Sequence, residues 1–513
     1  MWEFEGVLFN PTNMAARNPN EVSVANSPDM PKAAHQWLRT GPLKLCDRLT
    51  EAILYFMVVF SPWAFGTTQD WSIGVMNGAG YSLGTLWLVK CVFRWRTAGQ
   101  PISENLNARN TGFAKLLTRI LAGLTILLLA YCAVSALNAR AIYHAAERTF
   151  EFQSHLTWLP HSYDRAASWQ AFRNYLALAL AFWAARDWLR SEKPGESPRE
   201  QSARERPSYL PPRLRRLLWV LAINGAVLGM EGILQRFEGS GKLLGLVRPG
   251  YNRSADSQFG PYAYRSNAAQ YFNLVWPVCL GFWWALHRNA QIDFFRRRRF
   301  FEGARILLLP AAIIMAACPI ISTSRGGAIV AVFEICSALT VFLFAYRRTG
   351  WGTKSMILLV FLCTLVVAGY WGWEPLRPRL EKMLADNLTG REEVFENARR
   401  MAGDFPVFGS GPGTFGSLYQ LYRASWLETR ITFGWAGSAL LALAFLITNA
   451  RWFFPGGMEV SWRLPIFFWI SLAGCLLHAL ADFPLQIYSI LFVFILLCAI
   501  LFSLSRKGSF GGA

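Results

Sequence analysis

Long apolar runs recur along most of this chain, with polar segments between them. The runs are roughly 18 to 24 residues long, enough for a helix to cross the ~30 Å hydrocarbon core of a bilayer. Helices are expected because a helix satisfies its own backbone hydrogen bonds in lipid. The pattern predicts an all-α fold, a polytopic membrane helical bundle of about twelve transmembrane helices. The predicted spans are residues 49–65, 73–93, 116–137, 167–189, 214–235, 268–287, 305–322, 326–346, 354–373, 429–449, 464–481 and 484–504.

The polar segments divide the chain into four parts. Residues 1–48 are rich in Pro, Asn and Ser and lack a charged-then-apolar leader pattern, so we expect a cytoplasmic tail. Helices 1–9 occupy residues 49–373, and a large polar loop follows over residues 374–428. Residues 429–513 hold helices 10–12 and a short tail. The loop is where water-soluble chemistry on a charged substrate is expected.

Composition and charge refine this assignment. The chain is 53% hydrophobic, which is too apolar for a soluble enzyme of 513 residues, and its formal net charge is +19. A large positive charge suggests nucleic acid, but most Lys and Arg residues fall in alternate loops. They obey the positive-inside rule if both termini are cytoplasmic. We therefore expect a bilayer-embedded protein with no nucleic-acid partner. The large loop is expected on the outer side of the membrane, opposite the cytoplasmic termini.

Some basic residues remain on the side that this topology disfavours. One guanidinium group can donate two parallel hydrogen bonds to the oxygens of a phosphate. These residues therefore suggest an anionic ligand such as a lipid diphosphate. The alternative is ordinary surface pairing with the acids of the same loop: Glu381, Asp386, Glu392, Glu393, Glu396 and Asp404. The outer basic residues are Arg377, Arg379, Lys382, Arg391, Arg399, Arg400, Arg423 and Arg430, with Arg236, Lys242, Arg248, Arg253 and Arg265 in an earlier loop.

Common cofactor motifs are absent from the sequence. The nine cysteines are scattered, mostly within spans, without the Cys or His spacing of a zinc site. No Walker lysine loop and no GxGxxG motif after a strand is present. We therefore predict no metal and no cofactor, and any energy for a reaction has to come with the substrate.

Two candidate constellations lie at the outer ends of spans. Ser324-Arg325-Gly326-Gly327 begins the eighth span, where a charged residue is costly unless it has a function or a partner. The alternative is a tight turn whose arginine extends to the interface. Tyr264-Arg265-Ser266-Asn267-Ala268-Ala269-Gln270-Tyr271 leads into the sixth span, and Arg265 with the amides of Asn267 and Gln270 is placed to hold a sugar or phosphate group. Helix capping by Ser266 or Asn267 is the competing explanation.

Two further constellations lie in the large loop and near the C-terminus. Gly390-Arg391 opens a predicted helix through Ala402, and a Gly-Ser-Gly-Pro-Gly turn follows it. This turn either presents amide groups to an anion or is a plain surface turn. His478 and Asp482 are four residues apart at the end of the eleventh span, so the carboxylate can orient the imidazole of a general base. A structural histidine is the alternative.

In this order, these motifs resemble the O-antigen ligase and polymerase superfamily of bacterial inner membranes. The resemblance covers about residues 255 to 490 and is carried by Ser324 to Gly327, by Gly390-Arg391, and by the segments 404–416 and 431–437. It implies a multi-pass protein that transfers a glycan from an undecaprenyl-diphosphate carrier to an acceptor on the periplasmic face, without nucleotide or obligatory metal. The implied acceptor is lipid A core or a growing O-antigen chain. Arg325 and Arg391 fall on the family's arginine positions and are the implied diphosphate ligands.

One departure from the family pattern affects the expected chemistry. Ligases of this type carry a loop histidine followed by Asn, Ser or Gln, but counting back from Gly434 places Arg423 and Ala424 at these positions. We therefore include Arg423 among the substrate-binding candidates, and we take His478 with Asp482 as the nearest candidate base. Three hypotheses remain open: a glycan transferase, an inactive relative that binds lipid-linked glycan, and a lipid-glycan transporter. The sequence distinguishes neither ligase from polymerase nor one oligomeric state from another.

Overall fold

The computed structural model describes residues 32–97, 108–190, 210–292, 305–345, 389–422, 434–453, 463–480 and 482–504, with a few isolated positions between 355 and 377. Helices dominate these residues, which confirms the predicted helical bundle. A described helix overlaps each predicted span except 354–373, most of which lies outside the described residues. The long helices are α1 (Lys32–Trp63), α2 (Asp70–Thr97), α3 (Ala108–Leu137), α4 (Arg165–Arg190), α6 (Pro212–Glu238), α7 (Arg265–Ile292), α9 (Leu308–Ile321), α10 (Arg325–Ala345), α14 (Gly434–Phe453), α15 (Arg463–Ala479) and α16 (Tyr488–Leu504).

Local sequence explains where α6 begins and ends. Pro212 occupies the first helical turn, where its missing N–H group has no intrahelical acceptor to lose. Gly239 follows the last residue in a left-handed conformation with φ 61°, and its N–H group donates to the carbonyl of Gln235. Glycine adopts this conformation without a Cβ clash and so ends the helix. Arg236 is placed in the last turn by these signals.

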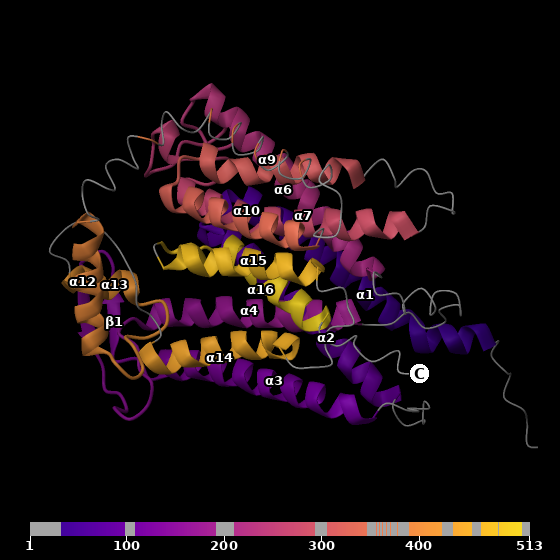
Figure 1. The fold of residues 1–513 in the computed structure, drawn as a ribbon. Coiled ribbons are helices and arrows are strands. Elements are labelled where there is room, and N and C mark those ends of the chain that lie inside the picture. The colour runs from indigo at the N-terminus through magenta and orange to yellow at the C-terminus, as the bar shows by residue number, and fades with distance from the viewer. Residues whose placement is uncertain are drawn as a thin grey trace, which may run out of the picture.

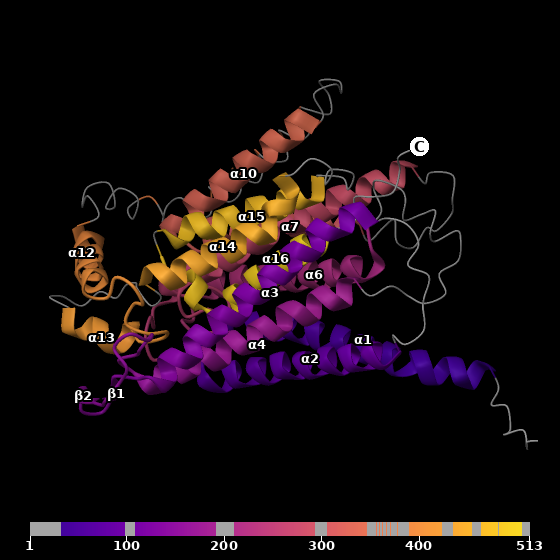
Figure 2. The same ribbon diagram turned by 90° about the horizontal axis from the view of Figure 1, so that it is seen from below.

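The shorter elements gather at one end of the bundle, which we call the loop end (Figures 1 and 2). An antiparallel hairpin of β1 (Ala141–His144) and β2 (Thr149–Phe152) lies there, with Ala141 opposite Phe152. The helices α12 (Thr389–Asp404) and α13 (Phe415–Tyr422) lie at the same end. Segments 239–264 and 322–324, which join long helices, also belong to this end.

The middle of the bundle is built around α7. This helix packs against α6, α9, α10 and α15, and nearly all its side chains from Ala268 to Trp284 are buried. Because α7 and α10 begin at the loop end and α15 finishes there, the polar ends of three packed helices meet.

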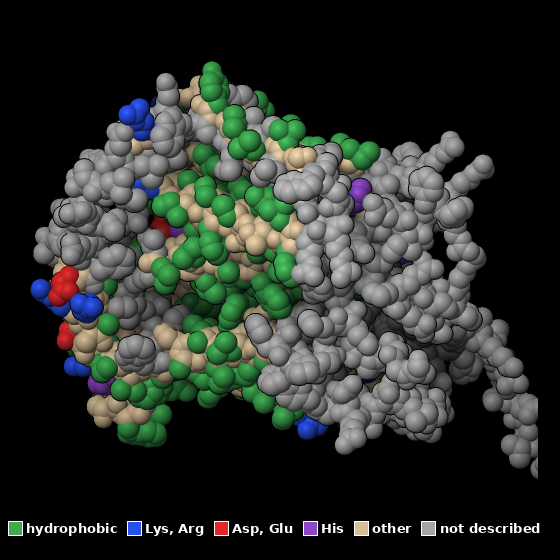
Figure 3. Space-filling model, in the orientation of Figure 1, with side chains coloured by type: hydrophobic (Ala, Val, Ile, Leu, Met, Phe, Trp, Pro, Cys, Tyr) green, Lys and Arg blue, Asp and Glu red, His purple; other side chains and the backbone are tan. Residues whose placement is uncertain are grey.

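The outer surface of the bundle is apolar. By length and composition, Lys115–Leu137, Pro212–Glu238 and Arg325–Ala345 can each cross a membrane, and four shorter apolar helices accompany them. Hydrophobic side chains cover the middle of the face in Figure 3, while charged ones are visible at the loop end. Large apolar side chains such as Ile126 and Leu127 on α3 are exposed. Such exposure is unfavourable in water but is expected where a helix contacts lipid. The chain is therefore a membrane protein.

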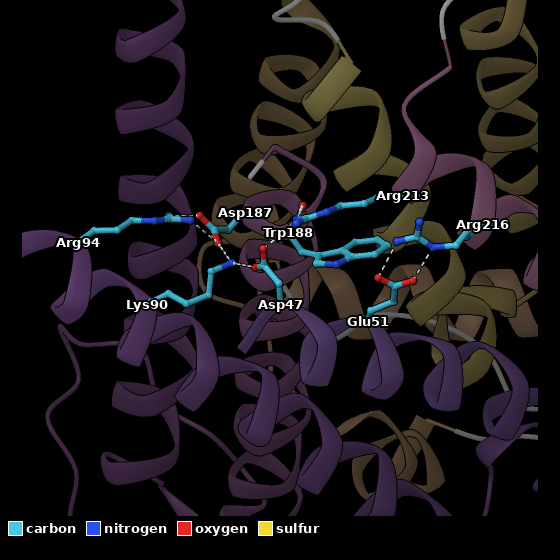
Figure 4. Close-up of polar contacts among 8 residues, drawn as sticks. All are labelled: Asp47, Glu51, Lys90, Arg94, Asp187, Trp188, Arg213 and Arg216. Atoms are coloured by element: carbon cyan, nitrogen blue, oxygen red, sulfur yellow. Dashed lines mark hydrogen bonds and ion pairs between the residues drawn. The ribbon is translucent and has the colours of Figure 1, made fainter. Parts of the chain in front are cut away.

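An ion-pair network joins α1, α2, α4 and α6 (Figure 4). It lies near the end of α4 and the start of α6, opposite the loop end. Lys90, only 2% exposed, pairs with Asp47 at 2.6 Å and also with Asp187. Arg213 pairs with Asp47 at 2.6 Å, and Arg94 pairs with Asp187 at 2.5 Å. On the same helices, Arg216 contacts Glu51 through two hydrogen bonds of 2.6 and 2.8 Å. Four segments that are distant in sequence are thereby fixed together.

Replacing Lys90 with methionine should destabilise the protein by about 3 kcal/mol. The substitution keeps the apolar stem but leaves Asp47 and Asp187 as neighbouring carboxylates without the cation between them. The midpoint of thermal unfolding in detergent micelles measures the effect. Lys115→Met, at an exposed position of α3, is the matched control and should change stability by less than about 0.5 kcal/mol. Equal midpoints for the two variants would show that the network does not hold these helices together.

Candidate functional site

Three of the sequence constellations meet at the loop end of the bundle. The first turn of α7, the first turn of α10 and the last turn of α15 come together because their helices pack side by side. Glycine makes the contact close: a Cβ atom at Gly326 would lie 3.1 Å from Nε2 of His478. A Cβ atom at Gly327 would lie 2.3 Å from that of Ala269, which no larger residue tolerates without a shift. The two glycines therefore let α10 approach both α15 and α7.

Ser266 bridges His478 and Asp482. Its hydroxyl donates a short hydrogen bond to Oδ2 of Asp482 and lies 3.1 Å from Nε2 of His478. The His478 and Asp482 atoms themselves are 3.9 Å apart, too far for a hydrogen bond. The i, i+4 spacing thus brings the two residues close, but the carboxylate orients the imidazole through Ser266 and not directly.

The network also determines which imidazole nitrogen carries a proton. Ser266 has one hydroxyl proton and gives it to Asp482, so its contact with His478 requires Nε2–H to donate. The basic nitrogen of His478 is then Nδ1. In this tautomer His478 can accept a proton at Nδ1 while its ring stays oriented by Ser266.

Asp482 is well supplied with hydrogen-bond donors. Its Oδ2 atom accepts from Ser266 and from the Tyr264 hydroxyl at 3.4 Å, and its Oδ1 atom accepts from the backbone N–H of Phe483 at 2.9 Å. Asp482 is 9% exposed and His478 is 2% exposed. Three hydrogen-bond donors therefore hold the Asp482 carboxylate in place beside Ser266 and His478.

The other predicted residues of this region lie around the cluster. Arg325 is the first residue of α10, partly exposed, and precedes Gly326 in the chain. Arg265 begins α7 and donates from Nη1 to the carbonyl of Asp256 at 2.6 Å. Asn267 lies in the first turn of α7, where its backbone N–H donates to the carbonyl of Tyr264 at 3.0 Å. The structure therefore brings Arg265, Asn267 and Arg325 to the same helix ends as His478.

The large loop contributes α12 and α13. Arg391 lies in the first turn of α12, whereas Arg423 lies outside the described residues. Met401 of α12 packs on Phe415 and Leu418 of α13. On the exposed side of α12, Arg400 and Arg399 lie 3.4 and 4.0 Å from Glu396. For these two arginines the structure agrees with the surface-pairing alternative.

The end of α13 is tied back to α12. Tyr422 donates from its hydroxyl to Oδ2 of Asp404 at 2.5 Å. Burial and then this hydrogen bond raise the pKa of Tyr422. The two helices of the loop thus form one packed unit.

The Gly409–Gly413 turn docks on the start of α4. Ser168 donates from its hydroxyl to the carbonyl of Pro412 at 2.7 Å, and the N–H of Tyr163 donates to the carbonyl of Ser410 at 3.2 Å. Gly411 has φ 109°, and a Cβ atom there would come within 2.7 Å of Ser162. These contacts give the turn a packing role in attaching the loop to the bundle.

Two buried polar residues of the core, Asn273 and Glu334, were not singled out from the sequence. Asn273 follows Ser266 and Gln270 on one face of α7, at i+7 and i+3, and both amide residues are buried. Glu334 of α10 is also buried, and its side chain occupies the space beside Gly474, one turn before His478 on α15. The sequence did contain a signal for these residues: polar side chains on one face of an apolar span, and an acidic residue within another. Membrane helices seldom carry such residues without a function.

The described residues contain no cluster of three or more His, Cys, Asp or Glu side chains suited to a metal ion. A search of curated proteins found no match to this chain. Residues 310–433, from α9 to the segment before α14, match the family model described as O-antigen ligase. The match contains Arg325, Arg391 and the glycine turn, while Ser266, His478 and Asp482 lie outside it. Over residues 310–433 the chain is thus similar to the O-antigen ligase family, and the resemblance to that superfamily is confirmed.

Proposed function

We propose that this protein transfers a saccharide from an undecaprenyl-diphosphate carrier to a hydroxyl group of lipid A core or of a growing O-antigen chain. The reaction is placed on the periplasmic face of a bacterial inner membrane, with both termini cytoplasmic. The observation that supports the proposal is the Ser266-linked pair of His478 and Asp482 beside Gly326, at the helix ends where Arg325 begins α10.

In the proposed reaction the acceptor oxygen attacks the anomeric carbon of the carrier-linked sugar. The acceptor O–H bond breaks and its proton passes to Nδ1 of His478, while the carbon–oxygen bond to the diphosphate breaks and its electron pair leaves with the diphosphate. Arginines stabilise the negative charge that develops on the leaving group. Arg325 and Arg391 are assigned to the diphosphate, and Arg265, Asn267 and Arg423 to the remaining contacts with the substrate.

Access to the base imposes a condition on this reaction. His478 is 2% exposed, and Ser266 and Gly326 lie against its imidazole. Both contacts lie on the Nε2 side of the ring, and the Nδ1 atom is buried as well. An acceptor hydroxyl therefore reaches Nδ1 only if the helix ends packed around His478 shift when the carrier binds. Loops and helix ends commonly move in this way when a substrate closes its site.

A second candidate is a relative that binds lipid-linked glycan without transferring it. Arg423 stands where ligases of this family carry a histidine, and the replacement candidate His478 is buried. Both observations argue against catalysis. Neither concerns Arg325 or Arg391, the residues assigned to the carrier diphosphate. The two functions differ in one measurable property, which is turnover.

Purified protein in lipid nanodiscs, supplied with undecaprenyl-diphosphate-linked glycan and an acceptor, separates the candidates. Transfer that depends on the carrier supports the proposal. Carrier binding without transfer supports the non-catalytic relative, and glycan counterflow across liposomes without covalent transfer supports a transporter. In cells that lack the protein, loss of polymer from the lipid A fraction indicates a ligase, whereas a shift to single repeat units indicates a polymerase.

A further inference from the structure

Arg236, in the last turn of α6, joins two segments of the loop end. Its Nη2 group donates to the Thr323 hydroxyl at 2.8 Å and to the carbonyl of Ser322 at 3.3 Å. Its Nη1 group donates to the carbonyl of Ala255 at 2.9 Å and lies 3.6 Å from Oδ1 of Asp256. The Arg236 side chain is only 16% exposed. The planar guanidinium thus connects α6, the 255–256 segment and the turn before α10.

Thr323 has an unusual conformation in that turn. Its φ is 58°, in the left-handed region that a β-branched residue rarely adopts. Its N–H group donates to the carbonyl of Ile320 at 2.9 Å, and Thr323 is fully buried. A backbone held in this region persists only where its surroundings enforce it. Arg236 bonds both the Thr323 side chain and the preceding carbonyl, so it enforces the conformation directly.

The turn leads immediately into the proposed site. Ser324 and Arg325 follow Thr323, and the Ser324 hydroxyl accepts from the N–H of Gly327 at 3.1 Å. Any change in the backbone at Thr323 therefore moves the base of the Arg325 side chain. The 255–256 segment is held from the other side by Arg265, which donates to the carbonyl of Asp256 at 2.6 Å. Arg236 and Arg265 together join the starts of α7 and α10.

We propose that Arg236 is a positioning residue for carrier binding: it holds Thr323 in its left-handed conformation and thereby places Arg325 toward the diphosphate. At least three hydrogen bonds of Arg236 are donated to protein atoms. Arg236 is therefore proposed to support the binding site and not to contact the ligand itself. The inference rests on the proposed carrier binding but not on turnover, because a non-catalytic relative would need the same arginine placement.

The test measures binding of undecaprenyl diphosphate to the full chain in nanodiscs. Arg236→Ala should weaken binding roughly tenfold to a hundredfold, the size expected for loss of hydrogen bonds from a charged group. Arg236→Lys keeps the charge and much of the packing, yet it should still lose several-fold because an ammonium group lacks the planar fork. If the alanine variant does not fold, the lysine variant provides the comparison. Arg148→Ala, at an exposed position of the hairpin turn, is the control and should bind as the wild type does.

A second substitution distinguishes positioning from direct contact. Glycine adopts φ near +58° without strain, so Thr323→Gly should restore most of the binding lost in Arg236→Ala or Arg236→Lys. Alone, it should change binding by about twofold or less. A direct contact between Arg236 and the diphosphate would not be rescued by a change in the backbone of Thr323.

The outcomes are separable. Unchanged binding in both Arg236 variants, or a loss that Thr323→Gly does not relieve, would overturn the inference. If the wild type binds undecaprenyl diphosphate but transfers no glycan, the enzymatic proposal fails while the role of Arg236 is still measured by binding. Where transfer does occur, the Arg236 variants should raise the KM for the carrier and leave the KM for the acceptor unchanged. A wild type that binds no undecaprenyl diphosphate would overturn both.

Discussion

Replacement of His478 by alanine is expected to lower carrier-dependent glycan transfer by about 10²- to 10⁴-fold, the usual contribution of a general base. Ser266→Ala and Asp482→Asn should have smaller effects, roughly tenfold, because they disturb the orientation of the imidazole without removing it. The rate of transfer by purified protein at saturating carrier measures these differences. The largest effect is expected for His478 because Ser266, which lies between His478 and Asp482 and contacts both, only orients the imidazole.

A matched control removes a histidine from the same end of the bundle. His144 lies on the exposed hairpin, 3.2 Å from Glu151, and His144→Ala should leave transfer unchanged. A second comparison introduces the family's residues at the loop: Arg423→His with Ala424→Asn should restore part of the transfer lost in His478→Ala. Full transfer by His478→Ala alone would show that another group accepts the proton.

The membrane-spanning helices could be predicted from sequence because their signal is local. A run of about twenty apolar residues defines a span whatever it packs against, and α3, α6 and α10 lie where such runs predicted them. The hairpin of β1 and β2 was not predicted, since four-residue strands in a polar connection give no comparable pattern. Apart from Arg377, the structure does not describe residues 374–388 at the start of the large loop, so this part of the predicted loop stays a prediction.

The site was only partly predictable because its contacts are long-range. The His478 and Asp482 pair was visible as an i, i+4 spacing, and the Ser324 to Gly327 turn as a charged residue among glycines. Ser266, however, meets Asp482 across 216 residues, and Arg236 meets Thr323 across 87. No local pattern encodes such pairings, because they follow from which helices pack on α7. Capping was the competing explanation for Ser266, and its bonds to His478 and Asp482 replace that reading.

Arg325→Ala is expected to weaken carrier binding and to lower transfer about a hundredfold, because the guanidinium is assigned to the charge that develops on the leaving diphosphate. Arg325→Lys should recover only part of this loss, since a lysine cannot offer two parallel N–H donors to a phosphate group. The effect should appear in both kcat and the KM for the carrier, as ground-state and transition-state contacts are lost together. Arg391→Ala should act in the same direction.

Arg399→Ala serves as the comparison within the large loop. Arg399 is exposed on α12 and lies 4.0 Å from Glu396, so its removal should cost less than about twofold in transfer. This contrast tests whether the outer arginines act as specific ligands or as a diffuse positive surface. A diffuse surface would make Arg325, Arg391 and Arg399 equivalent and sensitive to salt, since exposed charges are screened within about 10 Å at 0.1 M ionic strength. Specific diphosphate contacts would instead make the Arg325 and Arg391 variants less active in transfer than the Arg399 variant at every salt concentration.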